Sequence, residues 1–185
     1  MLIVNKWGAG GAVVVAGTDR VMGIEAEISQ ASPEDTEVIV YIYLAARHAS
    51  MPYLPDLQSD EETRAWFARR PKKFWVARCE GEIVGYMYLH ERMPDHLHER
   101  MLDDLYILPD WQGRGIGSSL LAKAKSLSPL RIELSTFQRN TKAKTFYEAH
   151  GFRRVGCTNG QNEEGEPDVQ YEWTGRSSSE SCFDE

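Results

Sequence analysis

The sequence predicts an α/β or α+β domain built on a mixed β-sheet. Three patterns support this prediction: a hairpin at residues 74–90, a strand–loop–helix–strand unit at 100–137, and a helix followed by two strands at 140–174. A hairpin pairs its strands antiparallel, whereas a strand–helix–strand unit places helices against the sheet. With 185 residues, 42% of them hydrophobic, the chain can bury the core of one such domain.

The first part of the domain is predicted to contain one strand and two helices. Apolar and polar residues alternate at 24–31, which is typical of a half-buried strand. A Ser-Pro pair at 32–33 then provides a cap and a first helical position for a helix that extends to about Ala49. A proline-containing loop at 53–60 precedes a short helix at 61–69.

The middle of the chain is predicted to form antiparallel strands. Strand patterns at 74–79 and 83–90 flank the turn residues Glu80 and Gly81, which predicts a hairpin. Another strand is expected at 100–107.

The last part alternates helices with strands. A helix is predicted at 115–127 from its apolar stripe, and another from Asn140 to His150. Asn140 is a suitable N-cap, and Gly151 is a suitable left-handed residue after the helix. The remaining strands are expected at residues 130–137, 152–157 and 168–174.

The two ends are predicted to lie outside the domain, which then spans residues 24–174. Residues 1–23 are interpreted as an N-terminal extension, and residues 175–185, rich in serine and acids, as a disordered tail. No stretch approaches the roughly 20 apolar residues that a membrane span requires.

Charge and cysteine content exclude several classes of protein. The net charge of -7 argues against a nucleic-acid binder and is better suited to a cationic substrate. Cys79, Cys157 and Cys182 are widely spaced, so their pattern indicates neither a disulfide framework nor a zinc site. Such cysteines are consistent with a reducing cytoplasm, where we expect the protein to lie. The histidines and acids at 95–99 form an isolated polar cluster, so no metal is expected. The sequence leaves open whether the chain is a monomer or a homodimer.

The most informative motif is the glycine loop at residues 112–117, QGRGIG, between a predicted strand and a predicted helix. Three glycines leave the backbone exposed where a helix begins, and the free N–H groups and helix dipole there favour an anion such as a pyrophosphate. The glycines could instead serve only a tight turn. A dinucleotide-binding loop is a further alternative, because Glu133 follows at the required distance, although Ser118 replaces the third glycine of that fingerprint.

Two sequence blocks follow each other in this part of the chain, LYILPDWQGRGIG at residues 105–117 and, after Asn140, FYEAHGF at residues 146–152. Together they resemble the GCN5-related N-acetyltransferase (GNAT) superfamily. The likeness in element order covers about residues 24–174. It implies a central, mostly antiparallel sheet with a splayed strand pair, flanked by helices. It also implies that acetyl-CoA is the acyl donor and that the reaction needs no metal.

The resemblance also implies which residues bind the cofactor. The loop backbone from Gly113 to Ser118 would hold the pyrophosphate with help from Arg114. The strand end from Leu105 to Ile107 would pair with the pantetheine arm, and Asn140 would contact the cofactor in addition to capping its helix. The expected cofactor-binding residues are Leu105, Tyr106, Ile107, Gln112, Gly113, Arg114, Gly115, Ile116, Gly117, Ser118, Asn140 and Tyr147.

Tyr147 is the predicted catalytic tyrosine. The family uses a tyrosine at this position as a general acid toward the departing CoA thiolate. A phenol can also simply donate a hydrogen bond to that sulfur, because its pKa of about 10 exceeds that of a thiol. A core aromatic at helical spacing is the structural alternative.

A general base is needed because only a neutral amine can attack a thioester. Glu133 and Asp103 are the predicted candidates. Related enzymes place a catalytic glutamate on the strand of Glu133, which shares a face with Arg131. Asp104, on the same strand as Asp103, is a further candidate. Asp103 lies an even number of residues from Leu105 and Ile107, so in a regular strand it would share their face. Each acid could also be an ordinary polar strand residue.

The acceptor is expected to contact segments outside these motifs. The connection at 162–168 carries four acids, and the loop at 51–56 could cover the site. These acids suggest a cationic amine, although a solvated acidic turn is the alternative. We therefore interpret the chain as an N-acetyltransferase that transfers an acetyl group from acetyl-CoA to a primary amine of a small molecule or peptide by direct attack. The alternatives are an NAD(P)-dependent oxidoreductase and a non-catalytic acyl-CoA sensor.

Overall fold

The computed structural model describes residues 26–70, 73–91 and 99–175. Within these residues the chain forms one mixed sheet of seven strands: β1 (Glu27–Gln30), β2 (Phe74–Cys79), β3 (Glu82–Glu91), β4 (Glu99–Ile107), β5 (Arg131–Phe137), β6 (Arg153–Cys157) and β7 (Asp168–Thr174). Their order across the sheet is β1-β2-β3-β4-β5-β7-β6. The β4–β5 pair is parallel and the other neighbours are antiparallel, which confirms the predicted mixed sheet.

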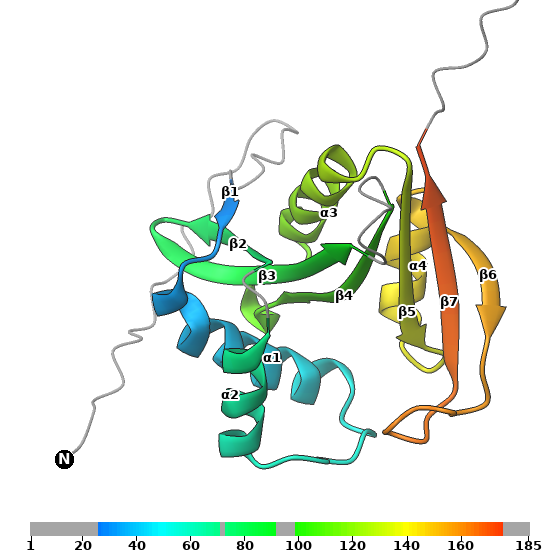
Figure 1. Cartoon of the computed structure of the whole chain (residues 1–185), viewed down its shortest axis with the longest axis horizontal. Helices are drawn as coiled ribbons and strands as arrows, with labels where there is room; N and C mark the ends of the chain where they lie inside the picture. Colours follow the sequence, from blue (N-terminus) through cyan, green and yellow to red (C-terminus); the bar gives the residue numbers. More distant parts are fainter. Residues whose placement is uncertain (1–25, 71–72, 92–98, 176–185) are drawn as a thin grey trace, which may run out of the picture.

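Helices cover both faces of this sheet (Figure 1). They are η1 (Pro33–Asp35), α1 (Thr36–Ser50), α2 (Asp60–Arg69), η2 (Pro109–Trp111), α3 (Ile116–Leu127) and α4 (Thr141–Ala149). One apolar cluster joins α1 and α2 to the sheet through residues such as Ile42, Phe67 and Tyr86. The other joins α3 and α4 to the opposite face through residues such as Leu120 and Phe152.

Residues with defined local roles mark the element ends, as the sequence predicted. In the β2–β3 turn, Glu80 and Gly81 both have positive φ, 54° and 84°. The Asn140 side chain accepts a hydrogen bond from Ala143 N at 3.1 Å, and Gly151 has a φ of 80°. The helix predicted from Pro33 to about Ala49 is divided into the turn η1 and the helix α1, and the Asp35 carboxylate accepts a hydrogen bond from the Ser32 N–H at 2.8 Å.

The β3–β4 ladder contains a β-bulge that shapes the rest of the molecule. Tyr88 pairs with Asp104 and Leu89 pairs with Leu102, so Asp103 is an extra residue in β4. Directly before the bulge, the parallel pairing between β4 and β5 covers only three residue pairs, which end at Met101. Beyond that point the two strands diverge, and the sheet opens into two wings (Figure 1).

Several sequence predictions concern residues that lie outside the described parts of the chain. These are the extension at 1–23, the tail from residue 176 onward, and most of the His and acid cluster at 95–99. Among the described residues, no three His, Cys, Asp or Glu side chains form a group suited to a metal ion. None of the helices in the described parts of the chain has the length and apolar character of a membrane span.

Candidate active site

A cavity of about 400 Å³ lies where the two wings of the sheet diverge. One side is formed by α1, α2 and the segment between them, and the other by β5, α4 and the β6–β7 connection. The residues of β4 and its bulge lie between these sides. Lining residues used below are Tyr43, Arg47, His48, Asp56, Trp66, Asp103, Asp104, Leu105, Tyr106, Ser135, Asn140, Tyr147, Glu163, Glu164 and Asp168.

The bulge turns two consecutive carboxylates toward this cavity. In a regular strand, Asp103 and Asp104 would point to opposite faces. Here the Asp103 carboxylate contacts His90 Nε2 at 2.9 Å, and Asp104 contacts Arg70, while both residues line the cavity. The expectation that Asp103 shares the face of Leu105 and Ile107 is therefore wrong, because the extra residue breaks the alternation.

Asp104 is the more buried of the two acids, with 7% of its surface exposed. Burial raises the pKa of its carboxyl group from 3.8 to about 6, because desolvation outweighs the opposing effect of the Arg70 guanidinium. Arg70 is held in turn by aromatic rings, with its guanidinium carbon 3.6 Å from the centre of the Trp66 ring and 4.4 Å from that of Tyr88. The site therefore has a buried acid that can exchange a proton near neutral pH.

Tyr147 lines the same cavity from α4, and it is 8% exposed. Its ring contacts Phe146 and Phe152, with centroid distances of 5.3 and 5.6 Å. Burial raises the pKa of the Tyr147 hydroxyl well above its usual value, and the negative charge of Asp104 raises it further. The phenol therefore stays protonated at neutral pH and can act as a hydrogen-bond donor.

The glycine loop forms a turn before α3 whose conformation needs glycine. Gly113 and Gly115 have φ values of 75° and 85°, and a Cβ atom at either position would meet nothing within 4 Å. The Gln112 side chain donates to the Ile107 carbonyl at 3.1 Å and so ties the loop to β4. The first helical bond at this end runs from Ser119 N to Gly115 O, which leaves the preceding N–H groups available to an anion.

Most of the predicted cofactor residues outside this loop line the cavity. Leu105 and Tyr106 line the cavity on the part of β4 that no longer pairs with β5. Asn140 lines it too, while it caps α4. Arg114 lies against the Trp111 ring, with 4.9 Å between its guanidinium carbon and the ring centre.

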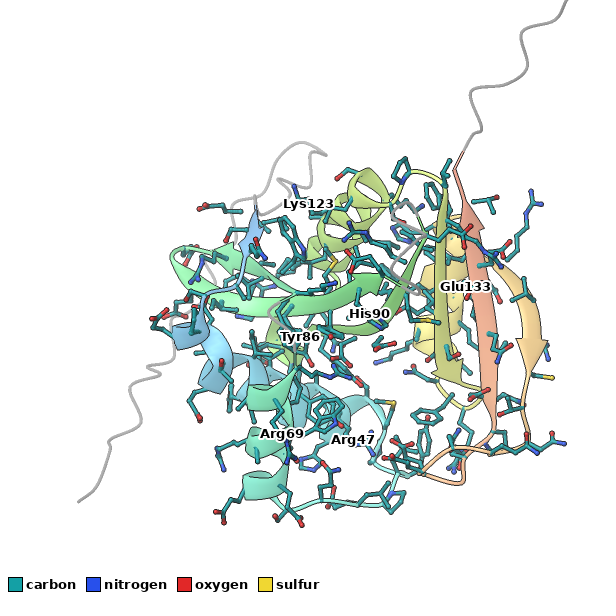
Figure 2. All side chains as sticks on the ribbon, viewed as in Figure 1. Arg47, Arg69, Tyr86, His90, Lys123 and Glu133 are labelled. Carbon is teal, nitrogen blue, oxygen red and sulfur yellow. The ribbon has the colours of Figure 1, made fainter. Side chains whose placement is uncertain are left out.

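Glu133 lies apart from these groups. It is on β5 beside the parallel pairing, and its carboxylate is 2.5 Å from Arg131 Nη2. Figure 2 shows it well separated from Arg47, which lines the cavity. Ser135, two residues further along β5, lines the cavity instead.

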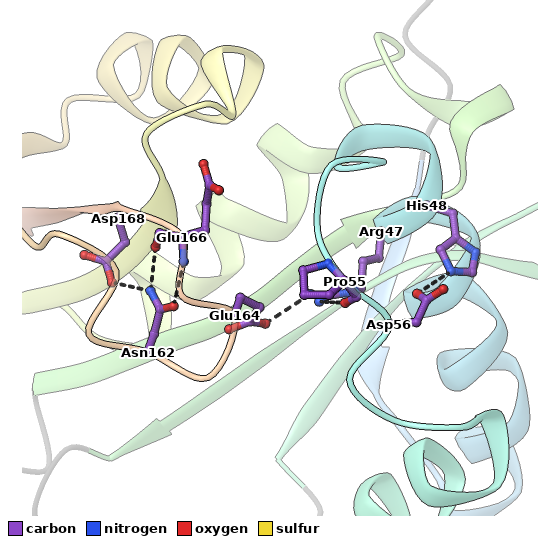
Figure 3. A network of polar contacts seen from close by, with 8 residues as sticks. All are labelled: Arg47, His48, Pro55, Asp56, Asn162, Glu164, Glu166 and Asp168. Carbon is purple, nitrogen blue, oxygen red and sulfur yellow. Dashed lines mark hydrogen bonds and ion pairs between the residues drawn. The ribbon is translucent and has the colours of Figure 1, made fainter.

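The acids of the β6–β7 connection are largely paired within the protein (Figure 3). Glu164 accepts from Arg47 at 3.3 Å, and Glu166 lies 3.7 Å from Arg139. Asp168 accepts a hydrogen bond from Asn162. Glu163 is exposed on the cavity rim. Arg47 also donates to the Pro55 carbonyl at 3.4 Å, so it joins the two loops that border the cavity.

Two arginines that pair with acids lining the cavity, Arg70 and Arg47, were not predicted from the sequence. Neither falls in a motif, and each gains its position only when a distant acid folds against it, Asp104 for Arg70 and Glu164 for Arg47. A lone arginine near a helix end gives no sequence signal of such a pairing.

Comparison with known proteins gives a consistent result. The profile described as "Acetyltransferase (GNAT) family" matches residues 42–152. An uncharacterized N-acetyltransferase of Archaeoglobus fulgidus is 27% identical over 142 residues, which cover 69% of this chain and 93% of that protein. The peptidyl-lysine N-acetyltransferase YiaC of Escherichia coli (strain K12) is 30% identical over 83 residues, 45% of this chain but only 51% of its own length.

A solved structure shows the same fold. The PaiA N-acetyltransferase of Thermoplasma acidophilum, determined in complex with coenzyme A, superposes with a TM-score of 0.61 at 19% identity. The match covers 81% of this chain and 99% of that one.

The buried carboxyl group of Asp104 should make folding stability depend on pH. Because its pKa is raised from 3.8 to about 6, the folded protein holds this proton more tightly than the unfolded chain does. The resulting stabilisation is complete below pH 3.8 and is lost as the pH rises through about 6. The free energy of unfolding of Asp104→Asn, relative to wild type, should therefore rise by on the order of 2 to 3 kcal/mol across this range.

Urea unfolding at pH values from 3.5 to 7.5 measures this difference. Asp103→Asn is the matched control, because it removes a neighbouring exposed carboxylate but leaves Asp104 in place. It should keep the pH dependence, shifted to somewhat lower pH, because the charge of Asp103 contributes to the raised pKa of Asp104. If the free energies of unfolding of Asp104→Asn and wild type changed in parallel with pH, the raised pKa could not belong to Asp104.

Proposed function

The chain belongs to the acetyltransferase (GNAT) family, and we propose that it transfers an acetyl group from acetyl-CoA to a primary amine by direct attack in a ternary complex. The observation that carries the proposal is a single cavity lined by a buried acid, Asp104, and a protonated phenol, Tyr147. The cavity adjoins the unpaired edge of β4, and the glycine loop follows that strand.

The donor half of the reaction is supported by the loop and the strand edge. The N–H groups at the start of α3 suit the pyrophosphate of CoA, and Gly113 and Gly115 leave room for its close approach. The stretch of β4 from Leu105 to Ile107 does not pair with β5, and this edge of the strand suits the amide groups of the pantetheine arm. The coenzyme A complex of the Thermoplasma protein supports the same kind of donor.

The chemical step assigns different tasks to the two cavity residues. The neutral amine attacks the thioester carbonyl carbon, a C–N bond forms, and the C–S bond breaks. The proton lost by the amine passes to the Asp104 carboxylate, directly or through water, and Tyr147 donates a hydrogen bond to the leaving sulfur. The raised pKa of Tyr147 favours hydrogen bonding over complete proton transfer to a thiolate.

Asp104 suits the role of base better than the two acids predicted from the sequence. A pKa of about 6 makes it a stronger base than an ordinary carboxylate, while it remains mostly ionised at pH 7. Asp103 lines the cavity but is exposed and paired with His90. Glu133 is engaged with Arg131 outside the lining. Both stay as alternatives for the base.

The acceptor we propose is a cationic amine of the lysine side-chain type. Acidic residues outnumber basic ones in the lining: Asp56, Asp103, Asp104, Glu163, Glu164 and Asp168 against Arg47 and His48. Tyr43 and Tyr106 add aromatic side chains to the lining, which suit an alkylammonium chain. The Escherichia coli relative named as a peptidyl-lysine N-acetyltransferase supports this class.

Calorimetry with acetyl-CoA and with NAD(H) tests the donor. We expect binding of acetyl-CoA alone, and we expect Gly115→Ala to weaken it about tenfold, because a Cβ atom would occupy the approach to the loop. Gly81→Ala is the matched control, since Gly81 has nearly the same φ, 84° against 85°, and equally open surroundings in the β2–β3 turn. Binding of NAD(H) instead would support the oxidoreductase alternative.

An acceptor screen that reports free CoA tests the second substrate. Lysine-containing peptides, diamines, polyamines and aminoglycosides should be acetylated, and neutral amino acids and neutral peptide N-termini should not. A preference for neutral peptides would remove the cationic class but keep the acetyltransferase.

Tyr147→Phe should lower kcat by about 100-fold while acetyl-CoA still binds, because only the hydroxyl that donates to the sulfur is lost. Tyr41→Phe is the control, since this α1 tyrosine is 62% exposed. CoA release under saturating substrates measures the effect. Unchanged turnover would remove Tyr147 from its role, and retained binding without any wild-type turnover would indicate a sensor.

Asp104→Asn should lower kcat/KM by about 100-fold and abolish the rise of activity with pH near 6. Asp103→Asn and Glu133→Gln should change kcat/KM by less than about threefold. A pH series of kcat/KM with the best acceptor distinguishes the three acids. A large loss in either control variant, with Asp104→Asn active, would assign the base to the acid predicted from the sequence.

A further inference from the structure

His150, the residue that follows α4, links the ends of two helices. Its Nδ1 atom lies 2.7 Å from the Phe146 carbonyl oxygen on α4, and its Nε2 atom lies 2.9 Å from Ser118 Oγ on α3. Ser118 is in the first turn of α3, directly after the glycine loop. The imidazole thus connects the loop to the helix that carries Tyr147.

The partners of the imidazole define where the hydrogens lie. A carbonyl oxygen only accepts, so Nδ1 must carry the hydrogen in the bond to Phe146. In the neutral ring, Nε2 then accepts from the Ser118 hydroxyl, which is able to donate. One ring therefore satisfies both contacts at the same time and fixes the position of Ser118 relative to α4.

Further contacts make this helix joint close-packed. A Cβ atom on Gly117 would lie 3.4 Å from the Phe146 ring, so the first turn of α3 rests against that side chain. The centroids of the Phe146 and His150 rings are 4.3 Å apart, and Lys125 Nζ donates a hydrogen bond to the His150 carbonyl at 2.6 Å. The bonds of His150 therefore act within a joint that has little room to slide.

We propose that His150 is a positioning residue that acts through Ser118 to fix the distance between the glycine loop and Tyr147. The inference rests on the proposed function, since that distance matters only if one ligand engages both places. Acetyl-CoA has such a shape, because its pyrophosphate and its thioester are joined by the pantetheine arm. Misplacing one end relative to the other then weakens the binding of the whole molecule.

Two substitutions separate the bonds of the imidazole. His150→Asn places its amide near the position of Nδ1, so it keeps the bond to Phe146 and loses the bond to Ser118. His150→Gln places its amide near the position of Nε2, so it keeps the bond to Ser118. Calorimetric titration of wild type and both variants with CoA and with pantetheine, which lacks the pyrophosphate, tests the proposal, and thermal unfolding checks that each variant is folded.

We expect His150→Asn to weaken CoA binding about tenfold and to change pantetheine binding by less than about twofold. His150→Gln should bind both ligands within about threefold of wild type. Equal losses for the two ligands, equal behaviour of the two variants, or no loss in His150→Asn would overturn the inference. Absence of CoA binding by the wild-type protein would refute the proposed function itself, and the inference with it.

Discussion

One extra residue in β4 determines the layout of this protein. The bulge at Asp103 interrupts the β3–β4 ladder directly after the last residue pair that joins β4 to β5. It points two adjacent carboxylates toward one side of the sheet, and beyond it β4 leaves its neighbour and provides an unpaired edge. The convergence of the two acids on the cavity and the free edge of β4 therefore both follow from a single local irregularity.

The bulge also places a carboxylate away from water, and Arg70 offsets part of the cost of burying its charge. A carboxylate removed from water is costly unless it is paired, and Asp104 is 7% exposed. Arg70 provides the opposite charge, while Trp66 and Tyr88 hold the guanidinium by its faces. Because pairing offsets only part of the desolvation, the pKa of Asp104 remains raised. This incomplete compensation is useful for an acid that must accept and release a proton.

The sequence was sufficient to predict the helices, the strands and the glycine loop, because all of these depend on residues that are close together in the chain. Periodicity and caps such as Asn140 and Gly151 act within a few residues, and the predicted ends agree with the structure to within about three residues. The face on which Asp103 lies could not be predicted from the sequence. Such a prediction assumes that side chains alternate along a regular strand, and Asp103 is the bulge residue. Ion pairs between residues distant in the chain could not be predicted from the sequence. Arg70 pairs with Asp104 across a separation of 34 residues, and Arg47 pairs with Glu164 across a separation of 117 residues.

The short parallel pairing has a mechanical consequence. Only three residue pairs at one end of β4 and β5 join the two wings of the sheet by strand pairing. A small change in the angle between the wings would therefore break few backbone hydrogen bonds there, whereas sliding within either wing would break a whole antiparallel ladder. The β4–β5 pairing is therefore the place where the sheet can bend at the lowest cost in backbone hydrogen bonds, and bending there would widen or narrow the cavity without unfolding either wing.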